Sequence, residues 1–104
     1  MPRPLTFSRV IDTYGPAIAS ITCTPGTPEY LAGLSPRQFA DLVRDASRRL
    51  LSSSLSSRRD VGADLYLAWR YLDEAVTADG AIRSDFLDLS AGFLSAVTSS
   101  TTLP

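Results

Sequence analysis

Arginine is the residue type in this sequence whose number and spacing point most directly to chemistry. All ten basic side chains of the 104 residues are arginines, and six of them fall within residues 36–59 beside two aspartates. A dense run of guanidinium groups binds phosphate oxygens and can position a nucleic acid through its backbone. The candidate residues for such a nucleic-acid-binding face are Arg37, Arg44, Arg48, Arg58 and Arg59.

The same arginines have two other interpretations. Asp41 precedes Arg44 by three residues and Asp45 precedes Arg48 by three, spacings at which side chains of one helix form ion pairs. Residues 60–90 carry two arginines and seven acids, a net charge of −5, so the basic segment can attract this region within one chain or between copies. The net charge of the whole chain is −1, which excludes a generally basic, histone-like protein. We expect ion pairing to account for these arginines, with nucleic-acid binding as the alternative.

The residue types on which most enzymes depend are missing. The sequence has no histidine, no lysine and no asparagine. Without histidine its 14 serines lack the usual general base, and without lysine no Schiff base can form. Cys23 is the single cysteine, which excludes a disulfide within the chain, and it is expected to be small and partly buried. Asp85 and Asp88 share a helix face, where acids near a helix start stabilise it by their charge. We expect no enzymatic activity, no catalytic residue, no metal and no cofactor.

One local resemblance bears on the nucleic-acid alternative. The run GLSPRQFADLVR, residues 33–44, resembles the turn and recognition helix of AraC-type helix-turn-helix regulators. The resemblance implies a helix that enters the major groove, with Arg37 and Gln38 near the bases. It covers only these residues, and the prolines within residues 25–28 leave about one turn of the helix that should precede it. The second helix-turn-helix motif of that family is absent, so we assign no family.

The hydrophobic spacing predicts an all-α fold, a small bundle in which apolar residues recur at three- and four-residue steps. Three main helices are expected over about residues 36–51, 60–78 and 84–97. One or two short helices are expected before them, the first ending at the stop signal of Gly15 and Pro16. Residues 17–24 fit a helix or a strand, and helix is preferred because a lone strand has no partner. Ser35 and Gln38 form a capping box that begins the first main helix.

The same signals predict how the chain is divided. Residues 1–104 form a single helical domain, with tails at 1–5 and 98–104. Residues 52–57 are expected to form a joint between two helices, and Ser84 is expected to cap the last helix.

Two of the predicted helices carry wider apolar arcs than a three-helix bundle needs. Such an arc indicates a surface that contacts another protein, unless the N-terminal third of the chain covers it. Trp69 falls on the apolar stripe of its helix and is expected in the core, whereas Tyr66 and Tyr71 point to different sides. The candidate interface residues are Tyr66, Leu67, Tyr71, Leu87 and Leu94.

These observations predict a small, non-catalytic helical protein that acts through contacts with other proteins. Its role is expected to be structural, accessory or inhibitory, in an oligomer or a larger complex. No run reaches the roughly 18 apolar residues of a membrane span, and residues 1–20 lack the continuous apolar core of a secretory signal. The depletion of lysine, asparagine and histidine indicates GC-rich coding, as in a GC-rich genome or its phage. We therefore expect a location in the cytoplasm or within a viral or phage assembly, and no membrane contact.

Overall fold

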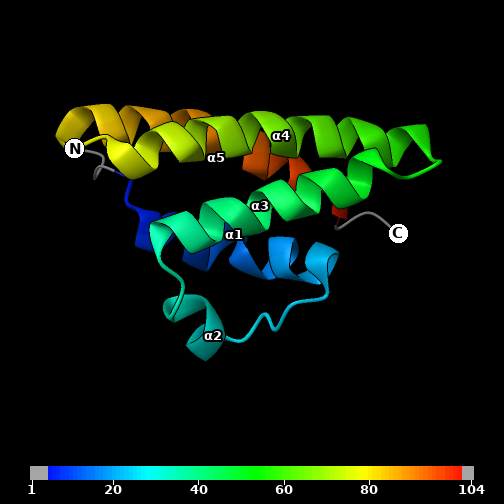
Figure 1. Cartoon of the computed structure of the whole chain (residues 1–104), viewed down its shortest axis with the longest axis horizontal. Helices are drawn as coiled ribbons and strands as arrows, with labels where there is room; N and C mark the ends of the chain where they lie inside the picture. The colour runs from blue at the N-terminus through cyan, green and yellow to red at the C-terminus, as the bar shows by residue number, and fades with distance from the viewer. Residues whose placement is uncertain (1–4, 102–104) are drawn as a thin grey trace.

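The computed structural model describes residues 5–101 and shows an all-helical chain, without a strand in this range (Figure 1). The expected all-α fold is confirmed. The helices are α1 (Phe7–Thr22), α2 (Pro28–Ala32), α3 (Pro36–Leu51), α4 (Ser56–Thr77) and α5 (Gly80–Thr101). Residues 1–4 and 102–104, which belong to the two expected tails, lie outside the described residues.

The four long helices form a bundle in which each helix packs against two neighbours. α4 packs between α3 and α5, and α1 packs against α3 and α5 on the other side of the bundle. α1 and α4 are therefore diagonal to each other, while the short α2 packs against α1 alone. Figure 1 shows that α1, α3 and α5 run in one direction and α4 in the other. The N-terminal third thus covers the inner sides of α3 and α5 and leaves the outer side of α4 open.

The first helix is longer than the sequence signals predicted. α1 continues through Gly15 and Pro16 as far as Thr22, so the expectation that it stops at this pair was wrong. Proline removes the hydrogen bond to the carbonyl of Asp12, but Pro16 and Asp12 are both exposed, and water can serve that carbonyl. Gly15 lies close to α2, since a Cβ there would lie 3.0 Å from a methyl carbon of Leu31. The preference for helix over residues 17–22 is confirmed.

Hydroxyl side chains cap the starts of both α2 and α3. The Thr27 hydroxyl accepts a hydrogen bond from the backbone N–H of Tyr30 at the start of α2. At α3 the Ser35 hydroxyl accepts from the N–H of Gln38 at 3.1 Å, and the Gln38 side chain accepts from the N–H of Ser35 at 2.8 Å. This reciprocal pair is the predicted capping box, and α3 has the expected bounds.

The last two helices are longer than expected at one or both ends. α4 begins at Ser56, four residues before the expected position, so the joint is limited to residues 52–55. α5 begins at Gly80, which adopts a positive φ of 58°, and Ser84 lies inside the helix rather than capping it. α5 also extends to Thr101, so residues 98–101 are helical rather than part of a tail.

Two buried serines donate hydrogen bonds to the backbone of α4. Ser47 in α3 donates to the carbonyl of Gly62 at 2.8 Å, and Ser90 in α5 donates to the carbonyl of Ala68 at 3.0 Å. These bonds satisfy the hydroxyls and tie both neighbours of α4 to fixed positions along it. The buried core also includes large side chains from all four long helices, such as Phe39.

An arginine closes the end of the bundle where α4 turns into α5. Arg83 donates from Nε to the carbonyls of Ala75 and Ala78, at 3.0 and 2.8 Å, and from Nη2 to that of Val76 at 3.1 Å. Its guanidinium also lies 5.5 Å from the ring centre of Phe7. These contacts supply hydrogen bonds to carbonyls of the last turn and the C-cap of α4, where regular helical bonding ends.

Candidate functional site

The outer side of α4 carries two different rows of side chains, and each row continues onto a neighbouring helix. One row faces α5 and follows heptad spacing: Asp60, Asp64, Leu67, Tyr71 and Glu74. The other row faces α3: Arg59, Tyr66, Arg70 and Asp73. Helical periodicity separates the two rows by about a quarter of a turn. α4 therefore forms the border between two surfaces of different chemistry.

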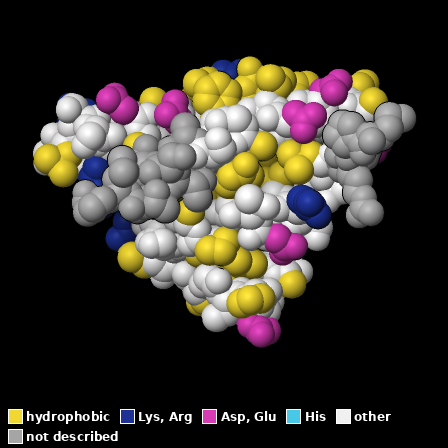
Figure 2. Space-filling model, turned by 180° about the vertical axis from the view of Figure 1, so that it is seen from behind, with side chains coloured by type: hydrophobic (Ala, Val, Ile, Leu, Met, Phe, Trp, Pro, Cys, Tyr) yellow, Lys and Arg dark blue, Asp and Glu magenta, His cyan; other side chains and the backbone are white. Residues whose placement is uncertain are grey.

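The first surface, the acidic apolar face, lies across α4 and α5. The ring of Tyr71 stacks between those of Phe86 and Phe93, with ring centres 6.3 and 6.0 Å apart. Leu67 lies one turn from Tyr71, and Leu89 lies between the two phenylalanines along α5. Figure 2 shows hydrophobic side chains gathered at the upper edge of the molecule, where α4 and α5 lie. The face combines a packed aromatic base with exposed aliphatic side chains.

The exposed members of this face are large hydrophobic residues. The exposed fraction is 41% for Leu67, 63% for Ile82 and 50% for Leu89. Ile82, Phe86, Leu89 and Phe93 recur at steps of four, three and four residues, the seam spacing of a coiled coil. This spacing was visible in the sequence, but Ile82 and Leu89 were not singled out as interface residues. The face carries the carboxylates of Asp60, Asp64, Glu74 and Asp85.

Two of the expected interface residues lie elsewhere. Leu87 and Leu94 are 0% and 1% exposed, because this side of α5 packs against α4 and α1. The expectation that they present an outer surface was wrong, and both belong to the core. Tyr66 and Leu67 are exposed but occupy different rows of α4, and Tyr71 is half-buried in its aromatic stack. The structure thus brings Leu67 and Tyr71 together and separates Tyr66 from them.

The second surface, the arginine face, lies across α3 and α4. Arg37 in α3 forms an ion pair with Asp73 in α4, which places both residues on the same side of the seam between the helices. Arg44 and Arg48 follow Arg37 at seven and eleven residues, and therefore lie along the same side of α3. On α4 the row of Arg59, Tyr66 and Arg70 leads to Asp73. The complete face comprises Arg37, Arg44, Arg48, Leu51, Arg59, Tyr66, Arg70 and Asp73.

Aromatic rings line the middle of the arginine face. Tyr66 and Trp69 have ring centres 5.6 Å apart and tilted planes. Trp69, which was expected in the core, is half-buried and packs against the core. Its Nε1 and the Nε of Arg44 are both buried atoms without a hydrogen-bond partner among the described residues.

The ion pairs differ from those predicted by spacing. The described residues form two, between Arg37 and Asp73 and, at 3.8 Å, between Arg44 and Asp45. The expected pairs of Asp41 with Arg44 and of Asp45 with Arg48 do not form. Attraction between the basic segment and an acidic helix of the same chain is present at Arg37 only.

Two candidate arginines lie at the end of the α3–α4 hairpin. Arg58 and Arg59 occupy the first turn of α4, and Arg59 donates to the carbonyl of Ser53 at 3.0 Å. The exposed leucines of this hairpin end, Leu51 and Leu55, have exposed fractions of 42% and 58%. Arg58 points to a different side of α4 from Arg59 by helical periodicity, so only Arg59 joins the arginine face.

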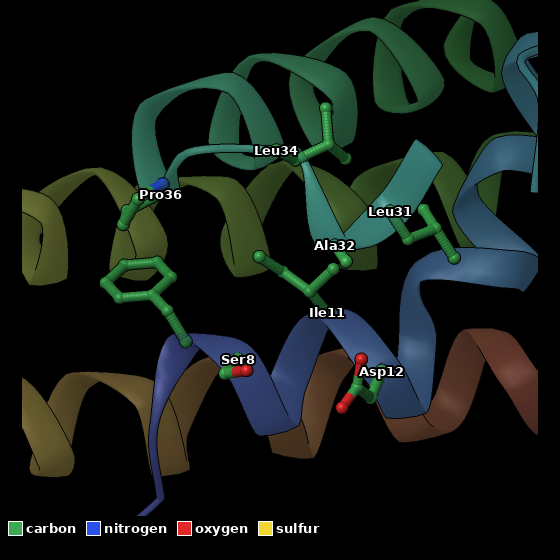
Figure 3. Close-up of a pocket in the computed structure, with 8 residues that line it drawn as sticks. Ser8, Ile11, Asp12, Leu31, Ala32, Leu34 and Pro36 are labelled. Atoms are coloured by element: carbon green, nitrogen blue, oxygen red, sulfur yellow. The ribbon is translucent and has the colours of Figure 1, made fainter. Parts of the chain in front are cut away.

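An open pocket lies between α1 and the start of α3. It has a volume of about 420 Å³, with apolar walls from Ile11, Leu31 and Leu34. Figure 3 shows Ser8 and Asp12 at one side of it, as the polar lining from α1. The remaining lining residues are Phe7, Ala32 and Pro36. A hydroxyl and a carboxylate on the same exposed helix side supply neither a general base paired to a nucleophile nor a metal-binding set.

Neither the acids nor the cysteine of the described part of the chain form a metal centre. Within residues 5–101 no group of three acidic or cysteine side chains could hold a metal ion. Cys23 is exposed rather than partly buried, because it forms the C-cap of α1 with a positive φ of 56°. This left-handed cap turns its side chain toward solvent.

Comparison of the chain with protein families, with curated proteins and with solved structures finds no match. Among the helices described for residues 5–101, none has both the length and the apolar content needed to cross a membrane. The acidic apolar face and the arginine face are therefore the features from which function is inferred.

Proposed function

We propose that this protein is a small, non-catalytic helical interaction protein that assembles with protein partners through its acidic apolar face. The observation that supports this proposal is the row of exposed aliphatic side chains over the Tyr71 stack. Complete burial of a leucine or isoleucine side chain contributes about 1.5–3 kcal/mol. The half-exposed side chains of Leu67, Ile82 and Leu89 can together contribute several kcal/mol to a complex.

The geometry of the face also fits association better than a role in stability. Its aromatic base is fixed by contacts within the chain, whereas its aliphatic rim contributes little to the fold. A pre-formed surface loses little conformational entropy on binding. The carboxylates at the rim of such an apolar centre orient the partner and keep the unbound protein soluble.

A photo-crosslinking amino acid in place of Leu89 is expected to form protein adducts when the producing cells are irradiated. The same amino acid in place of Tyr30, an exposed position on α2, is expected to give at least tenfold less adduct. Introducing Leu67→Asp beside the crosslinker should abolish the adducts, since it places a desolvated charge on the same face. The products are measured by gel mobility and mass spectrometry.

Adducts of twice the chain mass identify self-association, and adducts of other masses identify a foreign protein partner. Equal yields at positions 89 and 30 would contradict the proposal. Tyr71→Asp is a less suitable substitution, because Tyr71 is packed between two rings and its replacement would disturb the fold itself.

A second candidate function, nucleic-acid binding, is supported by the arginine face. Arg48, Arg59 and Arg70 project around Tyr66, and guanidinium groups beside an aromatic ring suit single-stranded nucleic acid. Arg37 is the weakest of the candidate residues, because Asp73 neutralises it.

This alternative predicts that the affinity for a fluorescent single-stranded oligonucleotide falls steeply with salt concentration. Replacing Arg48 and Arg59 with alanine should lower the slope of log K against log salt by about 0.7 for each lost phosphate contact. The measurement is fluorescence anisotropy, with Arg49→Ala on another side of α3 as the control. Failure to bind at low salt would exclude this function.

A further inference from the structure

We infer that the arginine face receives the acidic apolar face of a second copy of the chain, so that copies associate head to tail. This inference rests on the proposed function and adds the identity and the orientation of the partner. The observation that leads to it is that one molecule carries two faces of opposite charge, each with an apolar centre.

The charges of the two faces are complementary. The acidic apolar face carries four carboxylates, on Asp60, Asp64, Glu74 and Asp85, and no arginine. The arginine face carries five guanidinium groups, of which Arg37 is paired with Asp73 and Arg44 lies 3.8 Å from Asp45. Among the described residues, the guanidinium groups of Arg48 and Arg70 have no ion-pair or hydrogen-bond partner. Complementary potentials of this kind select a partner and set its register.

The apolar parts of the faces also match. Tyr66 and Leu51 on the arginine face are exposed to 42% each, and the opposite face presents Leu67, Leu89 and Ile82. Tyrosine and arginine are enriched in the buried centres of protein interfaces, where both combine apolar contact with hydrogen bonding. Contact between the two faces would remove all of these side chains from water.

A symmetric dimer is disfavoured by the same charges. Two acidic apolar faces would bring carboxylates together, and two arginine faces would bring guanidinium groups together. The faces lie on adjacent sides of α4, and the ion pairs of the described residues include none between an arginine of one face and a carboxylate of the other. A dimer formed by this heterologous contact still has one free face of each kind. Further copies can therefore add until a ring closes or an open filament forms.

The test uses cysteines at the centres of the two faces in a Cys23→Ser background. Variants carry Tyr66→Cys, Leu89→Cys or both, and a short bifunctional maleimide is added to the folded protein. The double variant is expected to give a ladder of covalent multimers. A mixture of the two single variants is expected to give a crosslinked dimer, and each single variant alone is expected to give none.

Charge substitutions provide the matched control. Arg48→Glu with Arg70→Glu should reduce crosslinking at least tenfold, whereas Arg49→Glu, on another side of α3, should leave it unchanged. Dimers of the Leu89→Cys variant alone would show a symmetric contact and overturn the inference. Absence of crosslinks in every variant would also overturn it, and nucleic acid found on the purified protein would then identify the occupant of the arginine face.

Failure of the head-to-tail inference can be distinguished from failure of the proposed function. If photo-crosslinking at position 89 captures a foreign protein while the cysteine variants give no multimers, the interaction function stands and self-association is excluded.

Discussion

Replacing Gly62 with alanine is expected to destabilise the fold by about 2–3 kcal/mol, although glycine is a poor residue for the middle of a helix. A Cβ at this position would lie 2.9 Å from the backbone nitrogen of Leu51 and 3.0 Å from the Cβ of Leu50. Backbone atoms cannot move aside as a side chain can, so α3 and α4 must separate locally. The shift would also stretch the bond from Ser47 to the carbonyl of Gly62. Urea unfolding followed by circular dichroism measures the loss.

Gly92 in α5 is the matched control for this substitution. A Cβ there would meet no atom within 4 Å. Gly92→Ala should therefore stabilise the protein by about 0.5–1 kcal/mol, since alanine has less backbone freedom to lose on folding. Opposite signs at the two glycines are the expected result. If Gly62→Ala also stabilises the protein, the close approach of α3 and α4 is wrong.

Replacing Phe39 with alanine is expected to lower the free energy of unfolding by about 3–5 kcal/mol. Phe39 is 0% exposed and is the largest of the fully buried side chains in the described residues. It lies in the early part of α3, where the surrounding helices cannot collapse into the space without moving the capped start of α3. The loss is a large share of the 5–15 kcal/mol that stabilises a typical domain. Urea unfolding measures the change.

The control for Phe39 is another aromatic residue in a different environment. Tyr30→Ala removes a ring that is 41% exposed on the short α2. Its effect is expected to remain below about 1 kcal/mol, as for most exposed positions. A loss at Phe39 no larger than the loss at Tyr30 would contradict the assignment of Phe39 to the core.

The fold was predictable where local chemistry decided it. The capping box of Ser35 and Gln38 placed the start of α3, because its hydrogen bonds lie within four consecutive residues. Likewise, the apolar periodicity predicted a helix over about residues 60–78, and α4 covers Ser56–Thr77. Short-range hydrogen bonding and helical periodicity are sufficient for such elements.

Other features depended on contacts that a sequence pattern does not contain. Gly15 and Pro16 are stop signals by themselves, but α1 continues through them, with Gly15 buried beside Leu31 and Pro16 exposed. The apolar arc of the last helix does not itself show which of its positions face a neighbour. In the structure α5 packs against α4 and α1, and Leu87 and Leu94 lie on the side that these helices cover.

The candidate surfaces were predictable in part. The sequence predicted Leu67 and Tyr71 as partners on one face, and the heptad spacing of Ile82 and Leu89 could have completed it. The pairing of Arg37 with Asp73 joins residues 36 positions apart, and helical spacing alone cannot show it. Only the packing of α4 between its neighbours reveals which acids and which arginines share a surface.

The parallel direction of α1, α3 and α5 has an electrostatic consequence for the charge pattern. Each helix carries a macrodipole with partial negative charge at its carbonyl end, and three of these ends gather at one end of the bundle (Figure 1). Arg48 and Arg49 occupy the last turn of α3 there, beside Arg58 and Arg59 at the start of α4. Arginines at a helix start are unfavourable for α4 alone, but they lie at the end of the bundle that holds the carbonyl ends of α1, α3 and α5. These arginines are therefore gathered where the helix macrodipoles are negative, and they reduce this negative potential before any partner binds.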